Sequence, residues 1–341
     1  MPDYAIGIDI GGTKIASVLI DRTGQSIAQS RCPTRPEDGV NAVLDRVVAG
    51  IREMESAASG SIAGVGVGIA GGVDHRSARL LLSSNLGWTN IPIGDLLVER
   101  LGSTWKGRLW ADIDVIATAL GELRYGAGRG TEHMLCITVG TGIGGGLIFD
   151  GRPYHGSAGG AGNIGHFILE PEGDRCGCGK QGCLETLASG PAIARRAVAL
   201  LNRGEESALS GLDRETITAI EVVEAARAGD TLARRILAEA GRYLGIALAY
   251  YVDLVNPERI VIGGGLRAAG DLLLEPIRAT INQWAIPANA ALIQVVPAEL
   301  DNGGAIGAGT LVWLNRDPGD GHPGGSGIDS PVARGGSRLD R

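Results

Sequence analysis

Lysine is scarce in this chain, since only Lys14, Lys106 and Lys180 occur among 31 basic residues. There is no run of basic residues and the formal net charge is −7, so nucleic acid is not expected as a partner. No stretch approaches the ~18 apolar residues of a membrane span. The opening residues, MPDYAIGIDIGG, lack the basic start and apolar core of a secretion signal. We therefore expect a cytoplasmic protein that does not bind membranes.

The remaining composition is that of a globular chain. Its 341 residues have room for two domains with substantial cores, and 44% hydrophobic and 20% charged residues are ordinary values. Residues 316–341 differ, because glycine, proline, serine and charge dominate there. Such a segment has too little apolar surface to offset the entropy of ordering, so we expect a disordered tail without a role in the chemistry.

Cysteine is also infrequent, but three of the five cysteines lie within eight residues. Cys176, Cys178 and Cys183 follow His166 in a glycine-rich segment. Three thiolates and one imidazole are a ligand set for a closed, tetrahedral structural Zn²⁺. The alternative, scattered cysteines and a core histidine, does not explain this density. The pattern therefore predicts a zinc knuckle with these four ligands.

Apolar patterning predicts alternating strands and helices, an α/β protein. Strands are expected at residues 4–10, 14–20, 25–31, 63–69, 109–113, 134–139, 146–149, 259–262 and 292–296. Helices are expected at residues 43–51, 115–125, 191–201, 217–228, 232–252, 271–284 and 305–314. A strand, a glycine turn and a second strand open both halves, which suggests two related lobes with a cleft between them. We place the first lobe at residues 1–117, with the last helix packing back on it, and the second lobe, with the knuckle, at 118–304.

Tight glycine turns can bind phosphate oxygens through backbone N–H groups. Two turns at matching positions, with a third at residues 263–265, favour a nucleotide across the cleft over plain hairpins. Asp9 precedes the first turn, where it faces Mg²⁺ or caps its own turn. Lys14 touches phosphate or is a solvated strand residue. The candidate nucleotide-binding residues are Asp9, Gly11, Gly12, Thr13, Lys14, Gly140, Thr141, Gly142, Gly264 and Gly265.

These motifs resemble the ROK family of sugar kinases and repressors over residues 4–314. The resemblance rests on DIGGTK at 9–14, GTGIGGG at 140–146, the zinc knuckle with Glu185, and IGGG at 262–265. It implies the actin-like ATPase fold, in which two ribonuclease H-like lobes close over ATP and a sugar. It also implies transfer of the γ-phosphoryl group to a hexose hydroxyl, usually the 6-hydroxyl, and a homodimer.

Asp114 is the candidate catalytic residue. It lies where a predicted strand ends and a predicted helix begins. This position also suits an aspartate that caps the helix, and the catalytic and capping roles are compatible. Phosphoryl transfer needs a carboxylate to accept the hydroxyl proton, and the sequence ALGE at 119–122 aligns the family's catalytic aspartate with Asp114. The resemblance also implies that His166, Glu185 and Asn85 contact the sugar.

Two positions depart from the family pattern. Ile113 replaces an asparagine before the catalytic aspartate, and Asn163 replaces a glutamate that, like the asparagine, binds ring hydroxyls in the family. A binding site that lacks a buried hydrogen-bond partner for a ring hydroxyl discriminates strongly against the sugar that carries this hydroxyl. Plain glucose should therefore fit poorly. Strand alternation would put Asp112 on the same face as Asp114, where its carboxylate could meet a substrate amine.

We therefore expect a kinase for a modified hexose such as kanosamine (3-amino-3-deoxyglucose), in antibiotic biosynthesis. A C7-cyclitol (valiolone-type) 7-kinase and an ordinary glucokinase are the alternatives. A ROK repressor is disfavoured because Asp9 leaves no room before the first loop for a helix-turn-helix region. A sugar-binding protein without catalysis is disfavoured by Asp114 and the intact glycine loops.

Overall fold

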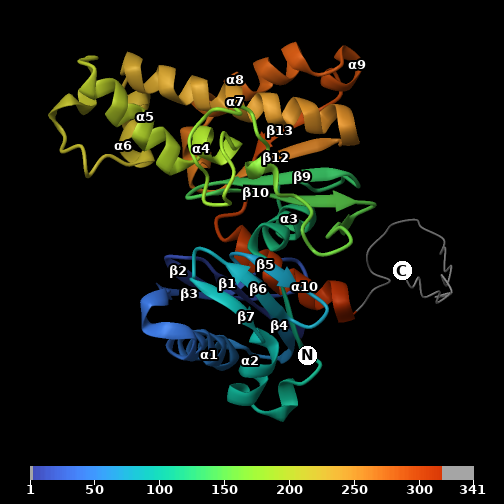
Figure 1. The fold of residues 1–341 in the computed structure, drawn as a ribbon. Coiled ribbons are helices and arrows are strands. Elements are labelled where there is room, and N and C mark those ends of the chain that lie inside the picture. The colour runs from blue at the N-terminus through green and yellow to red at the C-terminus, as the bar shows by residue number, and fades with distance from the viewer. Residues whose placement is uncertain (1–2, 317–341) are drawn as a thin grey trace, which may run out of the picture.

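The computed structural model describes residues 3–316, and its first lobe is built on a five-stranded sheet (Figure 1). Its strands, in spatial order, are β3 (Ser26–Pro33), β2 (Lys14–Ile20), β1 (Asp3–Ile10), β4 (Ser61–Ile69) and β8 (Leu109–Ile113). The first three strands form an antiparallel meander, and β4 and β8 continue the sheet in parallel with β1. The carboxyl ends of β1, β4 and β8 therefore meet at one edge.

The second lobe repeats this plan. Its strands, in spatial order, are β11 (Arg152–Pro153), β10 (Ile143–Phe149), β9 (Met134–Val139), β12 (Arg259–Gly263) and β13 (Gln294–Pro297). Again an antiparallel hairpin opens the sheet, and β12 and β13 run parallel to β9. The two glycine turns thus occupy equivalent places, as the weak sequence repeat indicated.

Helices cover the outer faces of both sheets (Figure 1). In the first lobe these are α1 (Gly39–Ala57) and α2 (Ile93–Leu101). In the second lobe they are α4 (Leu184–Ala188), α5 (Gly190–Asn202), α6 (Ala219–Arg227), α7 (Thr231–Val255), α8 (Asp271–Trp284) and α9 (Pro287–Ala290). The longest, α7, begins where the Asp230 side chain accepts from the backbone of Ala233 and ends at Asn256 in the left-handed conformation. None of the helices in residues 3–316 is long and apolar enough to cross a bilayer.

A small antiparallel sheet of the first lobe was not predicted. It consists of β5 (Gly72–Asp74), β6 (Arg79–Ser83) and β7 (Trp88–Ile91). These strands are short, and Leu81 and Leu82 are both exposed, so no alternating pattern marks them. The predicted tail, residues 316–341, lies outside the described residues except for Arg316, which ends the last helix.

Helices α3 (Asp114–Tyr125) and α10 (Gly303–Arg316) lie between the two sheets (Figure 1). Small residues at the contacts let the backbone of α10 touch the backbones of the first sheet and of α3. A Cβ atom on Gly7 would lie 1.9 Å from the carbonyl oxygen of Ala305, and one on Gly307 would lie 1.6 Å from that of Ala117. The boundary that we placed between residues 117 and 118 falls inside the continuous helix α3, which packs against both lobes.

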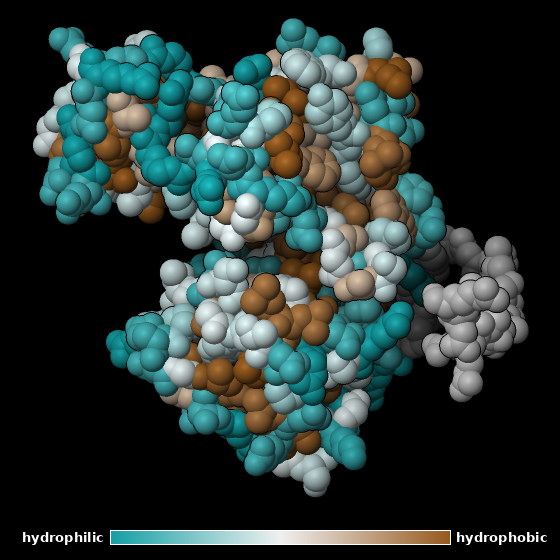
Figure 2. All heavy atoms as spheres, in the orientation of Figure 1, coloured by the Kyte–Doolittle hydropathy of each residue, from teal (hydrophilic) through white to brown (hydrophobic). Residues whose placement is uncertain are grey.

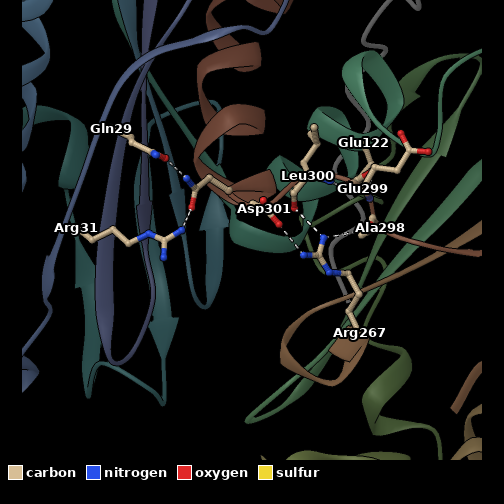
Figure 3. Close-up of polar contacts among 9 residues, drawn as sticks. Gln29, Arg31, Glu122, Arg267, Ala298, Glu299, Leu300 and Asp301 are labelled. Carbon is tan, nitrogen blue, oxygen red and sulfur yellow. Dashed lines mark hydrogen bonds and ion pairs between the residues drawn. The ribbon is translucent and has the colours of Figure 1, made fainter. Parts of the chain in front are cut away.

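Residues 298–302 carry the chain from the second sheet to α10, and side chains from three directions bind this connection (Figure 3). Arg267 donates to the carbonyl oxygens of Ala298 and Leu300 at 3.0 and 3.2 Å. Glu122 of α3 accepts from the backbone N–H groups of Glu299 and Leu300 at 3.1 and 2.9 Å. Asn302 pairs with Gln29 and Arg31 of β3. This connection is therefore hydrogen-bonded to both lobes.

Candidate active site

Asp9 and Asp114 come together at the carboxyl edge of the first sheet. Asp9 is the penultimate residue of β1, and Asp114 is the first residue of α3, directly after β8. Both flank the amino end of α10, because a Cβ atom on Gly304 would lie 2.8 Å from Asp9 Oδ2, while Gly68 faces both Asp114 Cα and the Gly304 carbonyl. The sequence placed these two carboxylates at one site, and the fold brings them there.

The environment of both carboxyl groups favours their neutral forms. Burial raises the pKa of Asp114 above its ordinary value, although two backbone N–H groups oppose the shift. Burial, followed by the charge of Asp114, raises the pKa of Asp9 to about 7, against the opposing charge of Lys14. Two desolvated carboxylates that repel each other are a favourable place for a cation, which would restore both to the ionised form.

The first glycine loop closes the β1–β2 hairpin. Gly11 N–H donates to the carbonyl oxygen of Lys14 at 3.0 Å, and the Thr34 hydroxyl donates to that of Gly11 at 2.7 Å. Asn85 lies against this loop, since a Cβ atom on Gly12 would be 3.2 Å from Asn85 Cβ. Thr13 and Lys14 are exposed at the tip. The loop and the predicted sugar-contacting asparagine are thus neighbours.

The second and third glycine turns meet in the other lobe. Gly264 has φ +82°, and a Cβ atom there would lie 2.4 Å from the carbonyl oxygen of Val139, so only glycine fits. Gly265 lies next to Gly140, and Gly140 N–H donates to the Gly142 carbonyl at 2.9 Å. These predicted nucleotide-binding residues form one continuous backbone surface.

Strand β10 lies between the start of α3 and the loop that carries His166. On one side, a Cβ atom on Gly146 would lie 2.6 Å from the carbonyl oxygen of Val115, the residue after Asp114. On the other side, a Cβ atom on Gly145 would lie 2.7 Å from the carbonyl oxygen of Gly162. The glycine run 144–146 therefore lets α3 and the loop that carries His166 approach the same strand.

The four predicted metal ligands form one cluster. Their ligand atoms all lie within 4.8 Å of one another. The Nδ1 atom of His166 is 3.6 Å from Cys176 Sγ, and Cys178 Sγ is 3.6 Å from Cys183 Sγ. Zinc–sulfur bonds of ~2.3 Å in a tetrahedron separate two sulfurs by about 3.8 Å. The donor set and its spacing fit Zn²⁺, which His166 would bind through Nδ1 together with the three cysteine thiolates.

Glu185 connects the knuckle to the second glycine loop. Its Oε2 accepts from the backbone N–H of Ile143 at 2.9 Å, and its Oε1 lies 3.9 Å from Cys176 Sγ. Asn163, the replacement for the family glutamate, is exposed and donates from Nδ2 to the Gly160 carbonyl at 2.9 Å. Both residues belong to the segment 156–185, in which the resemblance expects sugar contacts.

Asp112 does not share a strand face with Asp114, because β8 ends at Ile113 and Asp114 already belongs to α3. The strand-alternation argument was therefore wrong. Asp112 is 2% exposed, and its Oδ2 lies 2.8 Å from His155 Nε2. This carboxylate already has a partner, and the amine contact that we predicted for it has no support in the geometry.

Comparison with known proteins assigns the family. The model of the ROK family matches residues 5–314. The chain belongs to the ROK family. It is 38% identical over 321 residues to a glucokinase of Halalkalibacterium halodurans, covering 91% of this chain and 94% of that protein. It is also 33% identical to the regulator NagC of Escherichia coli, covering 91% of this chain and 75% of the regulator.

A solved structure shows the same architecture with ligands. A ROK family glucokinase from Streptomyces griseus, in complex with glucose and AMPPNP, superposes with a TM-score of 0.80 at 35% identity, covering 90% of this chain and 98% of that one. The two-lobed actin-like ATPase fold is thereby confirmed. The protein is a glucokinase-like, ATP-dependent carbohydrate kinase.

Sequence reasoning missed the histidines beside Asp112. His155 bonds to Asp112, and His75 stacks on His155 with ring centroids 3.8 Å apart. The chain has only five histidines, and the position of His155 directly before the glycine-rich segment 156–162 was a signal. Their meeting depends on the approach of the two lobes, which no local pattern reveals.

Proposed function

We propose that this ROK kinase transfers the γ-phosphoryl group of ATP to the 6-type hydroxyl of a glucose-like hexose that is modified on its ring. Asp114 acts as general base. The observation that carries the proposal is the position of this carboxyl group, at the start of α3, beside Asp9 and the first glycine loop and one strand away from the loop that carries His166. The acceptor alcohol and the terminal phosphate would meet there.

The chemistry assigned to Asp114 is proton acceptance. A sugar hydroxyl is a weak nucleophile, and a positioned carboxylate that takes its proton accelerates attack on phosphorus by about 10²–10⁴. Desolvation, which raises the pKa of Asp114, also makes its carboxylate a stronger base than one in water. The first turn of α3 fixes this side chain, because Asp114 Oδ1 accepts from the backbone N–H of Val115 at 2.8 Å.

The glycine loops supply the phosphate contacts in this proposal. The hairpin turn at Gly11–Thr13 reaches the phosphates from one lobe, and the turn at Gly140–Gly142 reaches them from the other. An open hollow of about 460 Å³, lined by Thr141, Glu185, Ser189 and Pro191 among others, adjoins the second loop and is our candidate place for the nucleoside. Asp9 would hold Mg²⁺, which neutralises phosphate charge when bound.

The modification of the sugar is inferred from two side chains. Ile113 offers no polar atom at a position where the family has asparagine, and Asn163 offers an amide in place of a carboxylate. A ring hydroxyl placed against Ile113 would lose a hydrogen-bond partner, which disfavours the unmodified ring. Kanosamine and C7-cyclitols of the valiolone type remain candidates. Because Asp112 is bound to His155, the amine of kanosamine would need another acceptor.

Unmodified glucose is the second candidate, and the similarity to glucokinases favours it. A panel of glucose, N-acetylglucosamine, kanosamine and valiolone with Mg²⁺-ATP decides between the two, with kcat/KM as the measure and ³¹P NMR to locate the new phosphate ester. Our proposal expects a modified ring to exceed glucose by at least about tenfold. A preference for glucose would identify an ordinary glucokinase.

The role of Asp114 is tested separately. Asp114→Asn should lower kcat by about 10²–10⁴ on whichever sugar is preferred, because the amide cannot accept the proton. Asp95→Asn, which alters an exposed aspartate of α2, is the matched control and should leave kcat unchanged. Full turnover by Asp114→Asn would remove the general base from the mechanism.

A further inference from the structure

A buried carboxylate and an imidazole join the two lobes directly. Asp112 of β8 belongs to the first lobe and is 2% exposed. His155 follows β11 in the second lobe, and its Nε2 lies 2.8 Å from Asp112 Oδ2, so the imidazole donates to the carboxylate.

A second histidine fixes the ring that makes this bond. His75, in the turn between β5 and β6, stacks on His155 with an interplanar angle of 16° and centroids 3.8 Å apart. Burial, followed by the charge of His155, lowers the pKa of His75, so its neutral ring is favoured in the stack. The two rings line a hollow of about 300 Å³ with Asp112, Trp110 and residues of α10. The stack leaves His155 little freedom to turn away from Asp112.

Each partner of the bond is adjacent in the chain to a part of the proposed reaction site. On one side, Asp112 Oδ1 accepts from the backbone N–H of Ile113 at 2.8 Å, and Asp114 is the next residue. On the other side, His155 directly precedes residues 156–166, the loop that contains Asn163 and His166. A displacement of His155 relative to Asp112 therefore alters the distance between Asp114 and the loop assigned to the sugar.

We propose that His155 is a positioning residue of this kinase, which sets the place of Asp114 relative to the sugar hydroxyl through its bond to Asp112. This inference rests on the proposed role of Asp114 as general base. A reacting group misplaced by ~1 Å can lower the rate by about 10²-fold, because the alcohol and its base no longer meet in a near-attack geometry. The loop and the glycine turns bind substrate without using the bond between Asp112 and His155.

The test is steady-state kinetics of His155→Leu and His155→Gln in the full chain, with the preferred sugar. His155→Leu removes the donor and should lower kcat by about 10–100-fold, with KM for sugar and for ATP within about threefold of the parent. His155→Gln places an amide N–H near the position of Nε2 and should recover most of the lost turnover. His133→Leu is the matched control, since the His133 side chain is 41% exposed and lies 3.8 Å from Asp150 within one lobe.

The outcomes separate this inference from the proposed function. A fall of kcat in His155→Leu with rescue in His155→Gln supports it. An unchanged kcat, an effect on sugar KM alone, or an equal loss in both variants overturns it, while a loss of activity in Asp114→Asn would still support the proposed function. Should the leucine variant not fold, Asp112→Asn and its double variant with His155→Gln replace it. Their effects on kcat must be non-additive, and additive effects would overturn the inference.

Discussion

At the scale of single residues, the two carboxyl groups at the edge of the first sheet carry the most chemistry. Asp9 and Asp114 lie on either side of Gly304, and burial raises the pKa of each. Neither shift could be foreseen from the sequence, because each depends on what α10 and the second lobe bring to the site. The identity of Asp114 as a candidate was visible, since an aspartate between a buried strand and a helix is a local pattern.

The raised pKa of Asp114 leads to a prediction about pH. An aspartate accepts a proton only when ionised, so activity falls as the pH drops through its pKa. Since burial moves this pKa upward in the free enzyme, whose groups kcat/KM reports, the acidic limb of log(kcat/KM) against pH should lie above the ~3.9 of a solvated aspartate. Stopped-time assays from about pH 3.5 to about pH 9 measure it. A limb at or below pH 4 in a protein that remains folded would contradict the assignment, and the residual activity of Asp114→Asn should lack the limb.

At the scale of elements, the knuckle was the most predictable part of the site. Four ligands within one segment need only local folding, so the cluster that the fold contains could be predicted from the sequence. The small sheet β5–β7 was missed, because its strands are short and partly exposed. The Asp112–His155 bond was also missed, because its partners are 43 positions apart and belong to different lobes.

Removal of one knuckle ligand should affect sugar binding more than ATP binding. Cys178→Ser lowers affinity for Zn²⁺, and without the ion the His166 ring loses its fixed orientation. We expect loss of about one zinc per chain by elemental analysis and a rise of at least about tenfold in KM for the sugar, with KM for ATP changed far less. Cys32→Ser, outside the cluster, is the control. Retention of zinc and of the parent KM by Cys178→Ser would argue against the knuckle's role.

The glycines of α10 provide a prediction about packing. Gly307→Ala would place a Cβ atom 1.6 Å from the carbonyl oxygen of Ala117, and the backbone of α3 would have to move. Overpacking of this kind costs about 1–3 kcal/mol or more. Urea unfolding should therefore show a loss of at least about 2 kcal/mol, whereas Gly211→Ala, where no atom lies within 4 Å, should change stability by less than about 0.5 kcal/mol. Equal effects of the two substitutions would mean that α10 does not pack as closely as described.

At the scale of the whole molecule, the lobes share a core. One buried cluster combines residues of α3 and α10 with residues of β9 and β12, so the two sheets are not independent folding units. Figure 2 shows a hollow in the surface between the two lobes, and apolar residues lie in this narrow region. We expect one cooperative unfolding transition, despite the two-lobed outline, because the helices that join the lobes belong to both cores.

Glu122 is the residue whose loss should uncouple the lobes. It is completely buried, and its carboxylate accepts from the backbone N–H groups of Ala127, Glu299 and Leu300. Glu122→Ala would leave three backbone N–H donors without this partner, one buried and two partly buried, where α3 meets the connection at residues 298–302 (Figure 3). A buried donor without a partner costs about 1–3 kcal/mol. Differential scanning calorimetry should show a lower midpoint and a transition that broadens or splits, with a van't Hoff enthalpy below the calorimetric one.

The control for this experiment is the neighbouring Glu299→Ala. Its side chain is 56% exposed and lies 3.7 Å from Arg129, so its removal should leave the midpoint nearly unchanged. A single sharp transition for Glu122→Ala, with no loss of stability, would show that the buried carboxylate does not join the lobes. A split transition would instead mean that the connection at residues 298–302 transmits stability between the two lobes, and Asp9 and Asp114 both adjoin the helix that this connection begins.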